Sequence, residues 1–576
     1  GKKRGVGEGE GEVAGSGSAS PSPTSTPPSK PVKLSICSNC YQVKYCSREC
    51  QKLHWKHHKP FCQSVRNTSV DSDDIYSFAE RLQEQATEIQ VQHEELQESL
   101  NEVILSISET MERHHIDLPP SWKKRDKQIS VLRSRANLED LLKRCTSGEE
   151  GAQLAATKEC RKLLSDHKPP IGTLVEMGLV PIFVDFLNNN NNPKLQFEAA
   201  WVLTNICSGN SDQTWAVVEA GGVPVLIRLL QSDIELAEQC VWALGNIAAD
   251  SLQCRDILLD ADVVEGLRPF MTSKRISMMK NVTWTMSNLC NGVSDRHWPK
   301  IQSVLPLFAQ SLQWKDEEIL KDVCWSLSYI SGGTKERIQS VLNLNGNILR
   351  RLVQLLTHRS PSVQHAALIT IGNIVTAGDD GQTQVLLNLE LLPRLRKLLS
   401  HSKPSILKDA CFTLSNIAAG NHSQIQQLVD AKVFPALLLL FYTVSYEIKV
   451  EATWAIANAL SNGTDEHVRY LVHQGCIDPM ADVMVDADIS TLEAILEGFD
   501  HILRVGAEDI YKRGSSHYNS FALYFDASPL KEKFAEVMEQ CTSRPNVVRT
   551  IQRIYSMVEE ASQKISSMET DIEEFE

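Results

Sequence analysis

The sequence predicts an all-α fold in which repeated helical units stack into a solenoid. One observation is a Trp and an Asn four residues apart, as in Trp242 and Asn246 of the segment CVWALGNIAAD. A second is that the pair recurs along the chain, and a third is that no strand-like alternation of apolar and polar residues accompanies it. Residues four apart lie on the same face of a helix, so each pair marks one helix of a repeated unit.

The repeat has a nearly constant length. The positions equivalent to Trp242 are 201, 242, 284, 325, 369, 412 and 454, which are separated by 41, 42, 41, 44, 43 and 42 residues. A period of about 40 to 47 residues is typical of armadillo or HEAT units, whose helices stack on those of the next unit. Stacking also explains how a chain of 576 residues, too long for one compact core, buries its apolar side chains.

Composition narrows the classes of partner and compartment. The formal net charge is −14, which makes nucleic acid an unlikely main partner and favours a basic one. Five of the 15 cysteines lie between residues 37 and 62 and the others are scattered, so we expect a reducing compartment, the cytosol or the nucleus. No apolar run of membrane-spanning length or secretory leader is present. Because the chain opens at Gly1 without Met, we expect a truncated N-terminus.

The N-terminal part divides into segments of different composition. Residues 1–32 are rich in Gly, Ser and Pro and are expected to be disordered. Residues 33–65 hold the Cys/His cluster. In residues 72–118, apolar positions recur every seven residues, at Leu82, Ile89, Leu96 and Val103. This pattern fits either a single amphipathic helix or a weak coiled coil, and Pro119 and Pro120 end it.

Three further segments complete the predicted organisation. Residues 121–137 are basic, with KKRDKQISVLRSR as their main part. Helical units are expected from residue 138 to residue 560. The segment 561–576 forms an acidic tail, because METDIEEFE holds five carboxylates in nine residues; such a tail is solvated or contacts a basic surface.

The repeated Trp and Asn predict a binding groove. In a stack, equivalent helices line one surface, so the Trp and Asn form parallel ladders. Asn can bond both polar groups of a peptide backbone, and Trp faces can flank the stem and charge of Lys or Arg. Asp250, and Thr214 with the turn at Gly209, are placed to supply acceptors at the rim. The alternative is that the Trp are core residues and the Asn are caps or bends, but a repeated amide in a dry core needs a partner each time.

Several motifs resemble importin-α, the armadillo adaptor that recognises Lys/Arg-rich nuclear localisation signals. They include AAWVLTNICSGNSDQT, ALGNIAAD, CWSLSYISGG, IGNIVTAGDDGQTQ and SNIAAGNHSQIQQLVDAKVFP, spread between residues 138 and 560. The resemblance implies about nine to ten armadillo repeats. It also implies a larger signal-binding site formed by Trp201, Asn205, Gly209, Thr214, Trp242, Asn246, Asp250, Trp284 and Asn288.

A smaller signal-binding site is implied further along. The chain departs from the family there, with Phe412 in place of Trp, Ile369 in place of Arg and Gly332 where an acidic residue is common. Phe offers a weaker face to a cation than Trp does, so we expect the larger site to bind more tightly. The residues of the smaller site would be Tyr329, Asn373, Thr376, Asp379, Phe412, Asn416, Glu451, Trp454 and Asn458.

The Cys/His cluster predicts bound zinc. Its pairs, Cys-x2-Cys, Cys-x3-Cys and His-x3-Cys, have spacings suited to a structural, tetrahedral Zn²⁺ site, whereas unligated surface residues are the alternative. The segment resembles a MYND finger, which implies one complete site and half of a second. A truncated N-terminus, a one-zinc variant or completion by His54 would explain the missing half. The implied ligands are Cys37, Cys40, His58 and Cys62 for the first zinc, and Cys46 and Cys50 for the second.

Two functions compete, and neither is enzymatic, because no phosphate-binding loop, nucleophile elbow or open metal site is recognisable. The resemblance implies a nuclear import adaptor that shuttles between cytoplasm and nucleus, with a karyopherin-β carrier and an export receptor as partners. The alternative is a scaffold with a MYND finger and armadillo repeats that has lost carrier binding. The basic segment 121–137 separates the two, since only a transport adaptor needs it for the carrier.

Overall fold

The computed structural model describes residues 35–36, 44–45, 138–166, 169–344, 347–512 and 519–573. Among these residues the chain divides between Ala156 and Thr157 into two compact units. The segments 1–32, 72–118 and 121–137, for which disorder, an amphipathic helix and a carrier-binding role were expected, lie outside the described residues. The expectations for them stay predictions.

The strands that are described are two short ones in the segment expected to bind zinc. Strand β1 (Ser35–Ile36) pairs with β2 (Lys44–Tyr45) in an antiparallel arrangement that places Ser35 opposite Tyr45. The Cys and His residues expected to bind the metal lie outside the described residues. The strand pair therefore leaves the zinc prediction untested.

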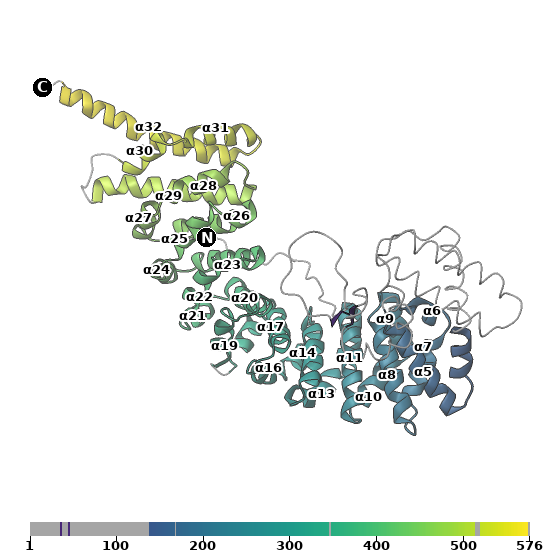
Figure 1. Cartoon of the computed structure of the whole chain (residues 1–576). Helices are drawn as coiled ribbons and strands as arrows, with labels where there is room; N and C mark the ends of the chain where they lie inside the picture. The colour runs from purple at the N-terminus through teal and green to yellow at the C-terminus, as the bar shows by residue number, and fades with distance from the viewer. Residues whose placement is uncertain are drawn as a thin grey trace, which may run out of the picture. The chain divides into compact units, whose positions relative to one another are not determined.

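The rest of the described chain is helical, and the predicted all-α solenoid is confirmed. A helix over residues 138–145 and α5 (Glu150–Leu164) come first. Nine units of three helices follow within the described residues, with a 3-10 turn, η1 (Arg268–Thr272), extending α13. Figure 1 shows these units following one another from α6 to α32.

The first two helices of each unit are short. They are α6 (Ile171–Glu176) and α7 (Leu179–Leu187), α9 (Ser211–Glu219) and α10 (Gly222–Leu229), α12 (Leu252–Asp260) and α13 (Val263–Leu267), α15 (Trp298–Gln302) and α16 (Leu305–Ser311), α18 (Lys335–Leu342) and α19 (Asn347–Leu355), α21 (Asp380–Leu387) and α22 (Leu391–Leu398), α24 (His422–Asp430) and α25 (Val433–Leu440), α27 (Asp465–His473) and α28 (Ile477–Met484), and α30 (Ser520–Ala527) and α31 (Leu530–Gln540).

The third helix of each unit is longer and packs on the third helix of the next. Its inward residues are fully buried aliphatic side chains, which supply the core between layers. These helices are α8 (Pro193–Cys207), α11 (Ile234–Asp250), α14 (Ile276–Cys290), α17 (Glu317–Ser331), α20 (Pro361–Ala377), α23 (Pro404–Ala418), α26 (Tyr446–Asn462), α29 (Ile489–Lys512) and α32 (Pro545–Glu573).

A recurrent cap starts the first helix of several units. At α9 the side chain of Asn210 accepts a hydrogen bond from the backbone N–H of Gln213, and the Gln213 side chain bonds back to the Asn210 N–H. Gly209 precedes this cap because a Cβ there would overlap the Gln213 amide. The same reciprocal cap opens α21, α24 and α27, so in these four units the cap residues fix where the first helix begins.

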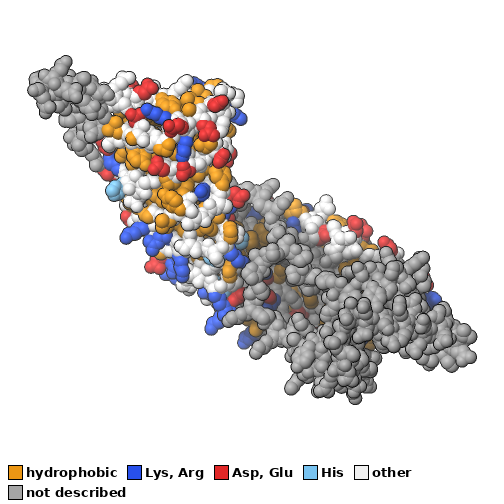
Figure 2. Space-filling view, turned by 45° about the horizontal axis from the view of Figure 1, so that its top comes forward, with side chains coloured by type: hydrophobic (Ala, Val, Ile, Leu, Met, Phe, Trp, Pro, Cys, Tyr) orange, Lys and Arg blue, Asp and Glu red, His pale blue; other side chains and the backbone are white. Residues whose placement is uncertain are grey.

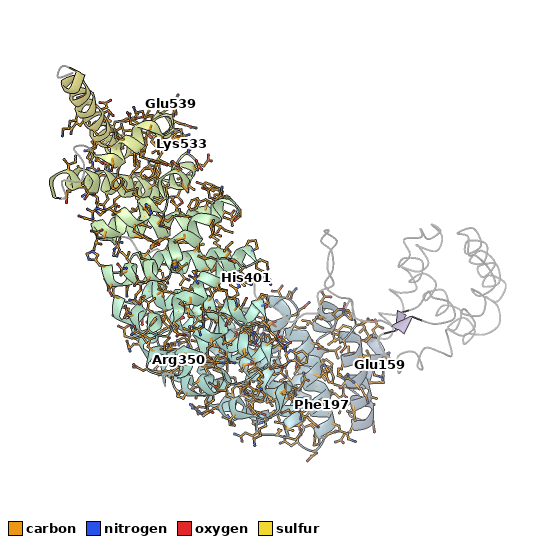
Figure 3. The ribbon with its side chains drawn as sticks, turned by 60° about the vertical axis from the view of Figure 1, so that its left-hand side comes forward. Glu159, Phe197, Arg350, His401, Lys533 and Glu539 are labelled. Atoms are coloured by element: carbon orange, nitrogen blue, oxygen red, sulfur yellow. The ribbon has the colours of Figure 1, made fainter. Side chains whose placement is uncertain are left out.

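Polar and apolar side chains mix on the exterior. Figure 2 shows acidic, basic and apolar side chains interspersed on one face. Figure 3 shows side chains along the whole stack, with Phe197 near its first layers, His401 further along and Lys533 in the last. Among the described helices, none combines the length and the apolar character that crossing a membrane requires.

Candidate functional site

The predicted Trp ladder lies on consecutive third helices. Trp201, Trp242 and Trp284 belong to α8, α11 and α14, and each side chain is half-buried. An indole that is half-buried keeps part of its face accessible, which a core Trp does not. These three residues are therefore surface walls held by the layers beneath them.

The Asn of each pair links its helix to the preceding one. The Asn246 amide donates to the Thr204 carbonyl oxygen at 2.9 Å, and the Asn288 amide donates to the Gly245 carbonyl oxygen at 3.2 Å. An Asn amide has two N–H groups and a carbonyl, so one donor holds the repeats together while the amide as a whole stays half-buried. The Asn residues therefore act neither as caps nor as bends.

Close packing fixes the position of the Trp284 side chain, the third of the ladder. A Cβ added to Gly245 would lie 2.7 Å from Cε3 of Trp284 and 2.5 Å from the Thr285 hydroxyl oxygen. That hydroxyl donates to the Val241 carbonyl oxygen at 3.0 Å. The Trp284 ring thus lies across α11 at the one residue without a side chain, and Gly245 sets the distance between α11 and α14.

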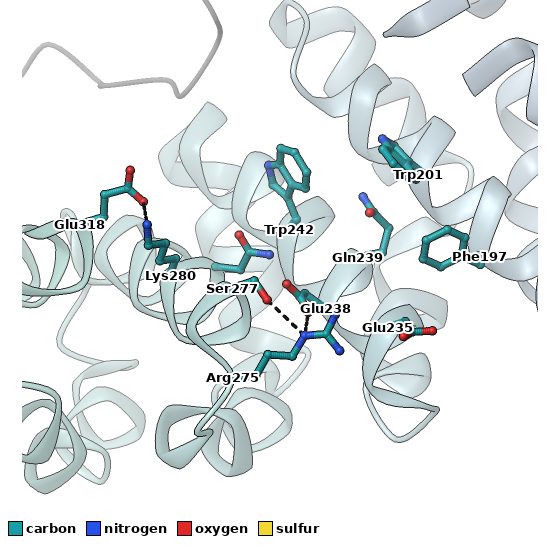
Figure 4. A pocket seen from close by; sticks show the side chains of 11 residues that line it. Phe197, Trp201, Glu235, Glu238, Gln239, Trp242, Arg275, Ser277, Lys280 and Glu318 are labelled. Carbon is teal, nitrogen blue, oxygen red and sulfur yellow. Dashed lines mark hydrogen bonds and ion pairs between the residues drawn. The ribbon is translucent and has the colours of Figure 1, made fainter. Parts of the chain in front are cut away.

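A cavity of about 390 Å³ opens beside Trp201 and Trp242 (Figure 4). Its charged side chains are largely paired with one another: Arg275 with Glu238 at 2.9 Å, and Lys280 with Glu318 at 2.8 Å. The sequence analysis predicted Trp201 and Trp242 but not the other residues of the lining. Several of these others precede a ladder Trp by three or four positions and so share its helix face. The lining is Phe197, Trp201, Glu235, Glu238, Gln239, Trp242, Arg275, Ser277, Lys280, Asn281 and Glu318.

One cation of the chain lies over the face of Trp201, the first Trp of the ladder. The guanidinium carbon of Arg161 lies 4.4 Å from the centre of a Trp201 ring. Its Nε donates to Glu198 at 2.5 Å, and the Phe197 ring meets the indole edge-on at 5.8 Å. Trp201 is therefore held in an orientation in which its face receives a cation.

Asp250 ends α11 with a half-buried carboxylate. Oδ2 accepts a hydrogen bond from the Ser211 hydroxyl at 3.0 Å, and the Cys254 thiol donates to the same oxygen at 3.5 Å. Within the described parts of the chain, no Lys, Arg or His forms a salt bridge with it, but Arg255 is near enough to interact with it electrostatically. Asp250 is thus an oriented carboxylate four residues after Asn246, without a salt-bridge partner among the described residues and with Arg255 as a nearby cation.

The expected role of Thr214 as an accessible acceptor is not met. Its side chain is 1% exposed, and its hydroxyl lies 3.2 Å from the Cys207 carbonyl oxygen and 3.3 Å from that of Asn210, to which it donates. The hydroxyl therefore ties the start of α9 to the end of α8. Gly209 is exposed in the same turn, where its backbone is open to a ligand.

In the smaller site, many predicted residues make internal contacts. Tyr329 stacks on Trp325 with ring centres 5.9 Å apart. The Asp379 carboxylate caps α21 by accepting from the Gln382 N–H at 2.8 Å. Trp454 is 7% exposed and its Nε1 donates to the Thr491 hydroxyl at 3.0 Å. Phe412 is half-buried, like the ladder Trp residues of the first half.

The amides of the smaller site repeat the link seen in the first half. Asn373 donates to the Ser328 carbonyl oxygen at 2.8 Å, and Asn458 to that of Ser415 at 2.9 Å. The Asn416 amide donates to the Thr376 hydroxyl at 3.0 Å. These three Asn side chains and Glu451 are buried. The Asn side chains of the predicted smaller site are thus buried, whereas Asn205, Asn246 and Asn288 in the first half are half-buried.

Burial changes the titration of several groups near the ladder. It raises the pKa of Asp322, three positions before Trp325, to about 6, and Lys321 partly opposes the shift. Burial also raises the pKa of the Cys207 and Cys240 thiols. The ten cysteines of the described helices are buried, which suits packing rather than thiol chemistry. No metal-binding group of Cys, His, Asp and Glu occurs within the described ranges.

Two family models match the chain. The armadillo/β-catenin-like repeat model matches residues 167–208, 210–249, 379–419 and 421–461, and the MYND finger model matches residues 25–62. A solved structure of an engineered protein is 26% identical, with a TM-score of 0.64, and the match covers 73% of this chain and 99% of that one. The expected armadillo repeats are confirmed, and so is the resemblance to a MYND finger.

The chain is also similar to curated plant proteins. Importin subunit alpha-1b of Oryza sativa subsp. japonica is 44% identical over 394 residues, which cover 67% of this chain and 72% of that protein. Importin subunit alpha-4 of Arabidopsis thaliana is 41% identical over 419 residues, which cover 72% and 78%. The match with each protein therefore spans more than two thirds of its length.

Proposed function

The chain belongs to the importin-α family, and from this premise we propose that it is a non-enzymatic nuclear import adaptor that binds Lys/Arg-rich localisation signals. The signal would lie extended along α8, α11 and α14. Its residues would contact the larger site, which comprises Trp201, Asn205, Gly209, Trp242, Asn246, Asp250, Trp284 and Asn288, with Thr214 supporting the turn beside Gly209.

The observation that carries this proposal is the environment of Asp250. A half-buried carboxylate that is oriented by the Ser211 hydroxyl and has no salt-bridge partner among the described residues favours a cation brought by a ligand. Arg255 lies near this carboxylate but forms no salt bridge with it. Trp201 supports the same chemistry, since Arg161 lies over its face at 4.4 Å. A ligand Lys or Arg between two such indoles would gain about 0.5 to 2 kcal/mol from each cation–π contact.

The smaller site would bind the second basic cluster of a longer signal, more weakly. Ile369 offers no ring and Phe412 a poorer one, so the ladder has fewer walls there. Asp379 is engaged in capping α21. The residues proposed for this site are Tyr329, Asn373, Thr376, Asp379, Phe412, Asn416, Glu451, Trp454 and Asn458.

The N-terminal segments would supply the remaining interactions. The basic residues 121–137 would bind karyopherin-β, and the chain would move between cytoplasm and nucleus with an export receptor returning it. The MYND-type segment would hold Zn²⁺ through Cys37, Cys40, His58 and Cys62, with Cys46 and Cys50 available for a second ion. Thiolate and imidazole donors at these spacings suit a structural zinc that stabilises the fold of the segment. Nucleic acid is not proposed as a partner, given the net charge of −14.

A charge reversal tests the groove. Asp250→Lys should weaken binding of a labelled basic signal peptide in fluorescence anisotropy by at least tenfold, because a charge-assisted contact contributes about 1.5 to 3 kcal/mol and the new charge repels. The matched control is Asp185→Lys, which makes the same change of charge at an exposed position of α7. Equal affinities of the two variants would show that the peptide binds elsewhere.

The scaffold alternative makes a different prediction about the carrier. A pull-down with karyopherin-β should retain the full chain and lose it when residues 121–137 are removed. A scaffold would bind the signal peptide with equal affinity and would not be retained in either form. Peptide binding and carrier binding together therefore separate the two functions.

A further inference from the structure

Each ladder Trp, together with the side chains around it, forms one rung of the Trp ladder. The first rung, at Trp201, differs in its charged side chains from the rungs at Trp242 and Trp284. Glu198 lies three residues before Trp201 on α8, and Arg161 bonds to Glu198 at 2.5 Å while its guanidinium covers Trp201 at 4.4 Å. The Arg161 and Glu198 side chains are only 17% and 13% exposed. An ion pair shielded from water in this way is held firmly by the two helices that carry it.

The equivalent positions in the next two rungs are neutral. Three residues before Trp242 is Gln239, whose amide donates to the Thr204 hydroxyl at 2.7 Å, and three residues before Trp284 is Asn281. Neither rung has a cation of the chain over its indole among the described residues. Of these three Trp residues, only Trp201 has a cation of the chain over its indole among the described residues.

The Trp201 face and the Glu198 carboxylate, which could receive a lysine of the signal, already contact Arg161. We propose that Arg161 is a built-in occupant that closes the first rung of the groove and fixes the register in which a basic peptide binds. The proposal rests on the function proposed above. Trp201 also lines the cavity shared with Trp242, and Arg161 does not belong to that lining. The outermost slot open to a ligand cation is therefore the one between Trp201 and Trp242.

The proposal predicts a new slot when the occupant is removed. Without Arg161, the Glu198 carboxyl group remains near the vacated Trp201 face, and a ligand cation can replace the guanidinium. Arg161→Met suits this purpose, since it retains an unbranched apolar stem against the indole while removing the charge. Arg161→Lys is the matched control, because it keeps a cation in place.

The test uses three labelled peptides in fluorescence anisotropy at physiological salt. One has a short lysine core flanked by glycines, and the other two replace the adjoining glycine by lysine at the N-terminal or the C-terminal side. For the full-length wild type and Arg161→Lys, we expect neither added lysine to change the dissociation constant by more than about twofold. For Arg161→Met, one of the two should bind about fivefold more tightly, and Glu198→Gln in the same chain should remove that gain.

Other outcomes overturn the proposal. If wild type gains from an added lysine as much as Arg161→Met does, the first rung is open. If Arg161→Met, with thermal unfolding like wild type, binds all three peptides equally weakly, Arg161 merely supports Trp201. If Arg161→Met fails to fold, Arg161→Gln is titrated with the same peptides and judged by the same criterion. Failure of wild type to bind the core peptide would instead refute the proposed function.

Discussion

Replacing Gly245 by alanine should disrupt the groove from below, while the equivalent change at Gly372 should not. A Cβ at Gly245 would lie 2.5 Å from the Thr285 hydroxyl oxygen and 2.7 Å from a ring carbon of Trp284. The same atom at Gly372 would have Thr413 as its close neighbour, at 3.1 Å. Both glycines are in the third helix of a unit and precede the ladder Asn by one residue, so they form a matched pair.

The magnitude follows from two opposing terms. Alanine is about 0.8 to 1 kcal/mol better than glycine inside a helix, and both variants gain this. Overpacking costs about 1 to 3 kcal/mol, and only Gly245→Ala incurs it in full. We therefore expect Gly245→Ala to lower the free energy of unfolding by up to about 2 kcal/mol relative to wild type, and Gly372→Ala to leave it unchanged or slightly raised.

Urea unfolding followed by circular dichroism measures the difference, and anisotropy with a basic peptide measures its effect on the site. Because the alanine displaces Trp284 and lengthens the bond from Asn288 to the Gly245 carbonyl, peptide affinity should fall with Gly245→Ala and stay near wild type with Gly372→Ala. Identical unfolding midpoints and identical affinities for the two variants would refute the packing argument for the third rung.

Three further predictions concern acidity, zinc and the second half of the groove. Because the pKa of Asp322 is raised in the folded chain, protonated Asp322 stabilises the fold below the unfolded pKa of 3.8, and this contribution is lost as pH rises to about 6. Urea unfolding at pH 4 and pH 7 measures this loss of unfolding free energy, and Asp322→Asn should reduce it by about 1 to 3 kcal/mol. A loss of the same size in wild type and Asp322→Asn would contradict the prediction. Metal analysis should find at least one zinc per chain, with a lower content in His58→Ala and unchanged helical content, whereas zinc-free wild type would remove the finger. A bipartite signal should bind little more tightly than a monopartite one, and Asn246→Ala should remove most binding of either; a bipartite peptide with near-normal affinity for that variant would make the smaller site the dominant one.

The sequence was sufficient to predict the solenoid because Trp and Asn recur along the chain at a nearly constant spacing. Trp at one position and Asn four residues later identified the third helix of successive units, and the structure places them there. The links that the Asn side chains make between adjacent repeats were less apparent. Asn246 and Asn288 look like ligand contacts in the sequence, yet one donor of each joins adjacent repeats.

Contacts between units were the part that the sequence did not reveal. Arg161 and Trp201 are 40 residues apart and meet because two layers stack, so no local pattern connects them. Thr214 looked like an accessible hydroxyl, but it is buried, and its hydroxyl donates a hydrogen bond to the Cys207 carbonyl oxygen of the preceding helix. A spacing of three positions between Glu198 and Trp201 was the available signal, since it puts an acid and an indole on one helix face.

We propose that this chain imports cargo proteins by binding their basic signals in the groove beside Asp250. The direct measurement is nuclear accumulation of a fluorescent cargo in permeabilised cells supplied with this chain and karyopherin-β. Accumulation with wild type and with Asp185→Lys, and its loss with Asp250→Lys, is the result that we predict. Accumulation that is the same with Asp250→Lys as with wild type, or absent with both although the peptide binds, would contradict the account.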